Sequence, residues 1–433
     1  MFLTDLPAAA RALAHGLTTS RALVEAALRR YGETQPTLHA FAWLDADRAL
    51  RLADDADRRT AARGQIGPLH GVPIGVKDIV DVAGLPAERG SAVFAGRVAE
   101  RDAALVANLR HAGAIVLGKT ITAELAYYHP GPTTNPHDAS RTPGGSSMGS
   151  AAAVAAGIVP AAVGTQTNGS IIRPAAYCGI TGLKPSHDRV PVDGVFPFAP
   201  TLDHPGALAR TVEGCAWLLA AMCAEPLTDW WAPSDAVPRF AALRTSEWED
   251  AEHGMRARFQ ADVDRIATLG GPVEWPDPPD GLDDGPAILQ TIMAYESART
   301  VALAIAGHEA QVSAVALELF ARGAAVPERE YRAALAQRDR LIAEYTRWVA
   351  PYDAILTPPA VGEAPSRETT GSPRFCSRWT LLGAPAVTIP TGRGPHGLPL
   401  GLQLVGAPGD DRRVIVAAAW VEARIGWRAE GVP

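Results

Sequence analysis

Three polar residues stand where the first half of the chain is otherwise apolar or made of small residues. Lys77 interrupts the run "PIGVKDIV", which is typical of a buried strand. Ser146 belongs to the glycine-serine turn "TPGGSSMGS", and Ser170 belongs to "TQTNGSIIRP". Burial of an ammonium group costs free energy, so a lysine at this position snorkels, pairs with Asp78, or serves as a neutral base.

Each serine turn is also consistent with an ordinary structural role. The first turn leads into an alanine-rich segment, where Ser150 is a candidate helix cap and free N–H groups could bind an anion. Ser170 taken alone is a loop serine. The residues before it, Thr167, Asn168 and Gly169, would present consecutive N–H groups to an oxyanion if the turn is tight.

The three residues gain meaning when they are considered together. A serine nucleophile needs a base, and the stretch around Ser170 contains no nearby histidine or acid. The nearest downstream histidine, His187, stands in "PSHDRVP", which is equally typical of a surface loop. A desolvated lysine that acts through a second serine would supply the missing base.

The surrounding pattern predicts one large α/β unit. Helical periodicity is expected at 20–30 and at about 46–62, and residues 67–183 alternate short β-branched runs with helical stretches such as 102–112. This alternation predicts a sheet that is at least partly parallel, with chemistry at the strand ends. We divide the single domain into N-terminal helices, a core with the polar residues, a mostly helical segment packed on the sheet, and a C-terminal part that completes the sheet (1–65, 66–225, 230–350 and 351–433).

Composition excludes several classes of protein. With 433 residues, 47% hydrophobic and 20% charged, the chain has the composition of a soluble globular protein. Its net charge of −7 and the absence of a Lys/Arg run argue against a nucleic-acid partner. Charges near the N-terminus argue against a signal peptide, and the longest apolar stretch, 151–163, is too short to cross a membrane, so we predict a cytoplasmic protein. No Cys or His spacing predicts a metal, and no cofactor is expected.

An ordered set of motifs resembles the amidase signature family of serine hydrolases. The motifs are "GVPIGVKD", "TPGGSSMGSAAAVAAG", "GTQTNGSIIRPAAYCGITGLKP", "TLDHPGALARTVEG", "LLGAPAVTIPTG" and "GLPLGLQLVG". The resemblance extends from the N-terminal helix almost to the C-terminus, and only about 230–350 lacks support. It implies a large mixed sheet flanked by helices.

The resemblance also implies a role for each matching residue. Ser170 corresponds to the nucleophile, Ser146 to a bridging serine whose peptide bond is cis, and Lys77 to the base. Ser147 is expected to support Lys77 by a hydrogen bond. The backbone amides of Thr167, Asn168, Gly169 and Ser170 correspond to the oxyanion hole. Ala126, Tyr127 and Tyr128 correspond to the acyl pocket, although both tyrosines could equally be core aromatics.

Four departures from the family pattern leave the substrate open. They are Met148, Gln166, Asn168 and the displaced arginine Arg173. The function expected first is hydrolysis of a linear, non-peptide, small-molecule amide through an acyl-enzyme. Alternatives are a carbamate or urea-type hydrolase, a glutamine-dependent amidotransferase subunit with a partner chain, and a non-catalytic binding protein. We expect a small-molecule amide or carbamate as ligand, no membrane partner, and a monomer or homodimer.

Overall fold

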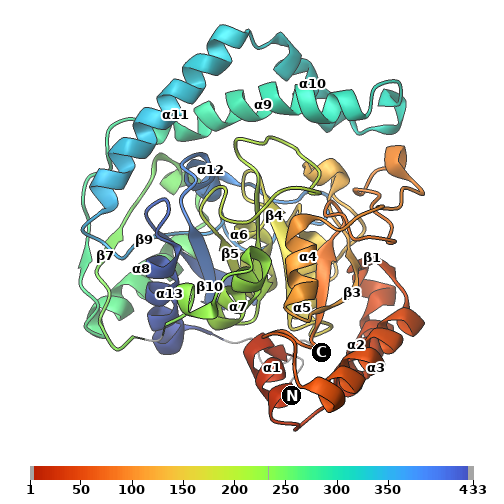
Figure 1. Cartoon of the computed structure of the whole chain (residues 1–433). Coiled ribbons are helices and arrows are strands. Elements are labelled where there is room, and N and C mark those ends of the chain that lie inside the picture. The colour runs from red at the N-terminus through yellow and green to blue at the C-terminus, as the bar shows by residue number, and fades with distance from the viewer. Residues whose placement is uncertain (1–3, 233, 428–433) are drawn as a thin grey trace.

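The computed structural model describes residues 4–232 and 234–427 and contains one mixed sheet of eleven strands (Figure 1). The strand order is β1-β3-β2-β4-β6-β5-β10-β11-β9-β7-β8. The strands are β1 (Phe41–Leu44), β2 (Pro73–Lys77), β3 (Ile115–Thr120), β4 (Ala161–Gln166), β5 (Thr181–Lys184), β6 (His204–Ala209), β7 (Phe240–Ala242), β8 (Val273–Glu274), β9 (Ala354–Thr357), β10 (Ala386–Arg393) and β11 (Pro399–Val405). The predicted α/β class is confirmed.

Helices surround this sheet along the whole chain. They are α1 (Leu6–Ala14), α2 (Ser20–Leu38), α3 (Ala46–Arg63), α4 (Ala104–His111), α5 (Met148–Ala155), α6 (Ile172–Cys178), α7 (Val212–Cys223), α8 (His253–Thr268), α9 (Gly285–Ala304), α10 (Ala314–Ala325), α11 (Glu328–Val349), α12 (Arg374–Leu381) and α13 (Asp411–Ile425). The helices predicted at 20–30, 46–62 and 102–112 correspond to α2, α3 and α4. Thr19 caps α2 by accepting a hydrogen bond from the amide of Ala22.

The parallel strands β2, β3 and β4 form one part of the sheet. β2 pairs in parallel with both neighbours, and every residue of the three strands is buried. Burial on both faces is typical of parallel strands that are covered by helices. Because parallel strands end at the same edge, Lys77 at the end of β2 lies beside the end of β4.

The short helix α5 lies against these strands and carries the glycine-serine turn to the same edge. Its close approach depends on small residues, because a Cβ atom on Gly149 would lie 2.1 Å from the carbonyl oxygen of Ala40. Ser147 occupies the N-cap position of α5. The alternative role of Ser150 as the cap is wrong: its hydroxyl donates to the carbonyl of Val163 and contacts Thr120 Oγ1 at 2.6 Å.

Helices α9, α10 and α11 form an arch above one end of the sheet (Figure 1). The main contacts of α9 are with α10, α11 and α12, whereas α8 packs on strands β10 and β11. Within segment 230–350, α8 therefore packs on the sheet, whereas helices α9 to α11 cover one end of it. The segment also adds the short strands β7 and β8 to the sheet, which the helical periodicity did not predict. In the C-terminal part, where the sequence predicts a return to the sheet, strands β9, β10 and β11 lie side by side in it.

The contact between α9 and α10 predicts a stability effect at Gly323. A Cβ atom there would lie 1.8 Å from the carbonyl oxygen of Ala294, so Gly323→Ala must move one helix. We expect a loss of about 1–3 kcal/mol in the free energy of unfolding, measured by urea denaturation. Gly32→Ala in α2 is the matched control, because no atom lies within 4 Å of the added methyl group. The control should gain about 0.5–1 kcal/mol, and equal effects in the two variants would contradict the packing argument.

Candidate active site

Lys77 is a fully buried lysine whose partners are oxygen atoms without a formal charge. Its Nζ lies 2.7 Å from Ser146 Oγ, 2.8 Å from Thr165 Oγ1 and 3.4 Å from the carbonyl oxygen of Thr165. Burial, the largest cause, holds the pKa of Lys77 well below its usual range, and Arg173 lowers it further, while the Asp203 carboxyl acts in the opposite direction. Lys77 is therefore suited to carry a neutral amine.

The alternative that Lys77 pairs with Asp78 is wrong. Successive side chains of an extended segment point to opposite sides, so neighbours in sequence are separated in space. Asp78 instead forms a buried ion pair with Lys119 of β3, with an Oδ1–Nζ distance of 2.9 Å. Asp78 is thus committed to another lysine.

Ser146 and Ser147 occupy the turn between β3 and α5. The peptide bond Gly145–Ser146 is cis, as the family resemblance implied. Ser147 Oγ donates to the carbonyl of Thr165 at 3.1 Å and accepts from its amide at 3.2 Å. The pairing of β4 with β2 ends at Val163, so the Ser147 hydroxyl replaces the missing strand partner of Thr165. The expected hydrogen bond from Ser147 to Lys77 is accordingly replaced by an indirect contact through Thr165.

Ser170 lies in the loop between β4 and α6, and its side chain is 8% exposed. Within the described part of the chain, its hydroxyl makes no hydrogen bond, so the structure links Lys77 with Ser146 but records no bond from Ser146 to Ser170. The amides of residues 167–170 also donate to no other described residue. Consecutive unpaired N–H groups can bind a developing oxyanion.

Gln166 and Asn168 fix this loop. Gln166 Oε1 accepts from the amides of Ile171 at 2.8 Å and Ile172 at 3.0 Å, which satisfies the start of α6. Asn168 Oδ1 accepts from Ser377 Oγ, and its backbone oxygen accepts from Thr380 Oγ1, both at 2.6 Å. These two departures from the family pattern therefore fasten the loop to α6 and α12.

A small cavity adjoins Ser170. It is lined by Ala126, Tyr127, Tyr128, Thr167, Asn168, Ser170, Arg173, Phe198 and Met293. Its free volume is about 10 Å³, close to the roughly 10–15 Å³ that one water needs. Tyr127 also stacks on Phe198 with ring centres 5.5 Å apart, so it both lines the cavity and packs in the core. Met293 comes from α9, so the helical arch contributes to this wall.

Arg173 brings a buried positive charge to the cavity. The side chain is 1% exposed, and one of its nitrogens donates to the carbonyl oxygen of Gly145. Nε and Nη1 have no hydrogen-bond partner among the residues described, and no carboxylate there pairs with Arg173. Buried donors without partners are costly, so the cavity favours a ligand that carries an acceptor.

Sequence reasoning missed Asp203 and Thr165. Asp203 Oδ1 accepts from Thr167 Oγ1 at 2.5 Å, and its Oδ2 accepts from the amides of Phe198 and Ala199. Burial raises the pKa of Asp203 to about 7. Asp203 belongs to "TLDHPG", which is part of a family motif, but the sequence does not show that its side chain contacts Thr167. Thr165 belongs to the buried strand β4, "AAVGTQ", where nothing in the sequence indicates a contact with Lys77.

Metal-ligating clusters and membrane spans are both absent from residues 4–232 and 234–427. These ranges contain no cluster of three or more His, Cys, Asp or Glu side chains arranged to hold a metal ion. No helix in the same ranges is both long and apolar enough to cross a membrane.

The eleven-stranded mixed sheet surrounded by helices is the fold of an amidohydrolase. The chain belongs to the Amidase family, whose model matches residues 22–415. It is 34% identical to a subunit of glutamyl-tRNA(Gln) amidotransferase from Acidothermus cellulolyticus, over 92% of this chain and 90% of that protein. It is also 34% identical to AtzE of Pseudomonas sp. (strain ADP), which is a subunit of 1-carboxybiuret hydrolase, over 92% of this chain and 93% of that protein. A crystal structure of an amidase matches with a TM-score of 0.89 and 32% identity, covering 98% of this chain and all of the other.

Proposed function

We propose that the protein hydrolyses the amide bond of a small linear, non-peptide substrate through an acyl-enzyme on Ser170. The observation that carries the proposal is the 2.7 Å contact between Lys77 Nζ and Ser146 Oγ in a fully buried setting. Burial lowers the pKa of Lys77, so the amine can be neutral and accept a proton. The loop that carries Ser170 starts at the neighbouring strand end.

In the proposed reaction, the neutral amine of Lys77 takes the proton of Ser146 Oγ, which takes the proton of Ser170 Oγ. Ser170 Oγ then bonds to the amide carbonyl carbon, and the carbonyl oxygen becomes an oxyanion held by the amides of residues 167–170. The C–N bond breaks as the proton returns through Ser146 to the leaving amine. A water molecule then loses a proton to the same relay and attacks the ester carbonyl carbon. The ester bond breaks, which restores Ser170 and releases the acid.

Arg173 supports a more specific substrate class, an amide whose acyl part is short and carries a carboxylate. A carboxylate would satisfy the unpaired Nε and Nη1 donors with charge-assisted hydrogen bonds. The small volume beside Ser170 supports a short acyl group. The similarity to a protein of 1-carboxybiuret hydrolase supports a carbamate or urea-type variant with the same residues.

A second candidate is an amidotransferase subunit that releases ammonia from glutamine. The 34% identity with the amidotransferase protein of Acidothermus cellulolyticus favours it. Both of the relatives described above are subunits, which supports assembly with another chain in place of the monomer or homodimer expected from the sequence. Glutamine also carries a carboxylate, so a direct comparison of substrates must separate the two candidates. A non-catalytic binding role is disfavoured, because Lys77, Ser146 and Ser170 are all present.

The proposal predicts that Ser170→Ala abolishes hydrolysis. Without the attacking oxygen, kcat should fall by roughly four to six orders of magnitude. A fluorophosphonate probe should label the unaltered protein and the exposed control Ser140→Ala but leave Ser170→Ala unlabelled. Equal melting temperatures establish that each variant is folded. Near-native turnover by Ser170→Ala would refute the assignment.

The buried amine predicts loss of activity toward low pH. The rate should fall as the pH drops through the lowered pKa of Lys77, because the protonated amine accepts no proton. Thr165→Val removes an oxygen that accepts from the charged form, so the acidic limb of kcat/KM should move to lower pH. Thr165→Ser keeps that oxygen and should retain the original limb. Identical limbs in the two variants, or a flat profile, would argue against Lys77 as the base.

The unpaired donors of Arg173 predict that the protein hydrolyses amides with a carboxylate faster than amides without one. Ammonia release from succinamate should exceed that from butanamide, which has a methyl group in place of the carboxylate. Arg173→Gln should reduce this preference by about 10-fold or more, the usual worth of a hydrogen bond between charged groups. The preference ratio is the readout, because any change in the Gly145 contact affects both amides alike. No preference in the unaltered protein would refute the carboxylate class, and a still higher rate on glutamine would favour the amidotransferase.

A further inference from the structure

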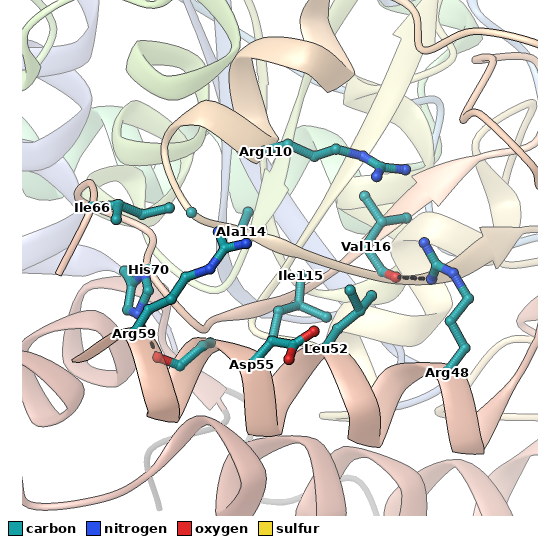
Figure 2. Close-up of a pocket in the computed structure, with 12 residues that line it drawn as sticks. Arg48, Leu52, Asp55, Arg59, Ile66, His70, Arg110, Ala114, Ile115 and Val116 are labelled. Carbon is teal, nitrogen blue, oxygen red and sulfur yellow. Dashed lines mark hydrogen bonds between the residues drawn. The ribbon is translucent and has the colours of Figure 1, made fainter. Parts of the chain in front are cut away.

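A second, larger cavity lies between α3 and the beginning of β3 (Figure 2). Its volume is about 210 Å³, many times the roughly 10–15 Å³ that one water needs. Ile115 and Val116 at the start of β3 line it, whereas Lys77 pairs with Thr120 at the other end of that strand. Five residues of strand span about 16 Å, so this cavity is separate from the candidate active site.

Three guanidinium groups line this cavity. Arg48 and Arg59 extend from α3, and Arg110 from α4 lies on the opposite side (Figure 2). Among the described residues that line the cavity, Asp55 is the one with a carboxylate. That carboxylate already pairs with Arg58. The cavity therefore has an excess of positive charge.

Two of these guanidinium groups lack a full set of hydrogen-bond or ion-pair partners among the described residues. Arg110 Nε lies 3.1 Å from Asp102, but its buried Nη2 has no hydrogen-bond partner among the described residues. Arg48 donates to the carbonyl of Val116 at 3.0 Å and forms no ion pair with a described carboxylate. Burial, the largest cause, and the nearby Arg110 guanidinium lower the pKa of Arg48, while the carboxylates of Asp45 and Asp102 act in the opposite direction.

His70 adds a further unsatisfied group. Its Nε2 lies 2.9 Å from Thr60 Oγ1 and 3.1 Å from the carbonyl oxygen of Ala56. Nδ1 has no partner in the described chain, although the residue is only 3% exposed. A water molecule in the cavity can satisfy this atom, because water both donates and accepts hydrogen bonds.

The remaining wall is apolar. Leu52, Ala56, Ile66, Ala114 and Ile115 line it, and Ile66 is 49% exposed at the mouth. An apolar wall beside guanidinium groups matches a ligand with a charged end and a compact hydrocarbon body. An inorganic anion would leave that wall uncovered.

We propose that this cavity is a second ligand site, which binds a small organic oxyanion through Arg48, Arg59 and Arg110. The ligand class is a carboxylate or a phosphate monoester with a short apolar body. Planar guanidinium groups bind both anions with paired hydrogen bonds. The site does not depend on the function proposed for Ser170.

The test measures binding of benzoate and phenyl phosphate to the full chain by calorimetry at low ionic strength. We expect saturable binding that weakens at least 10-fold in Arg48→Gln and in Arg110→Gln. Arg51→Gln is the matched control, because Arg51 is an exposed residue of α3 that does not line the cavity. Asp55→Asn removes the opposing charge and should tighten binding severalfold.

Two further measurements identify the cavity that binds the probe and the class of anion that it prefers. Binding that persists in Arg173→Gln assigns it to this cavity, and loss in that variant would place the probe in the candidate active site and overturn the proposal. The tighter of the two probes assigns carboxylate or phosphate, while equal affinity for inorganic phosphate would overturn the organic class. Absence of saturable binding, or unchanged affinity in Arg48→Gln, would refute the site. Arg48→Gln and Asp55→Asn decide the outcome if Arg110→Gln, which loses its contact with Asp102, fails to fold.

Discussion

The proposed reaction depends on the burial of one amine, that of Lys77, without a carboxylate beside it. Lys119 on the adjacent strand shows the alternative, because it is equally buried but pairs with Asp78 at 2.9 Å. In that buried ion pair each partner favours the charged form of the other, which acts against the effect of burial on both pKa values. Lys77 contacts only hydroxyl and carbonyl oxygens, so losing its proton relieves the cost of burial. Lys119 is thus suited to a structural ion pair, whereas Lys77 is suited to accept a proton.

The sheet and one short helix provide the geometry that this amine requires. Parallel pairing of β2 with β4 places Thr165 beside Lys77, and the end of that pairing leaves the backbone of Thr165 open to the hydroxyl of Ser147. The small residues of α5 bring the preceding turn close enough for Ser146 to reach Nζ. The end of the strand pairing, the packing of α5 and the proposed proton transfer therefore depend on the same few residues.

The sequence allowed a good prediction of the parts that depend on local pattern. The α/β class, helices α2 to α4 and the return of the C-terminal part to the sheet follow from periodicity, and the motifs around Lys77 and Ser146 pointed to residues that are in contact. Contacts between distant segments were not predictable. The pairing of Asp78 with Lys119, the bond from Asp203 to Thr167 and the arch of α9 to α11 all depend on which surfaces meet after folding.

Arg173 and Lys77 link substrate binding to the base in the proposed reaction. The Arg173 guanidinium adds to the effect of burial in lowering the pKa of Lys77 and so favours the neutral amine. A carboxylate bound to Arg173 would neutralise that charge and leave the opposing influence of Asp203, so the pKa of Lys77 would rise. A higher pKa makes the amine a stronger base at the moment when Ser170 must lose its proton. The buried arginine would then recognise the substrate and also strengthen the base only when the substrate is present.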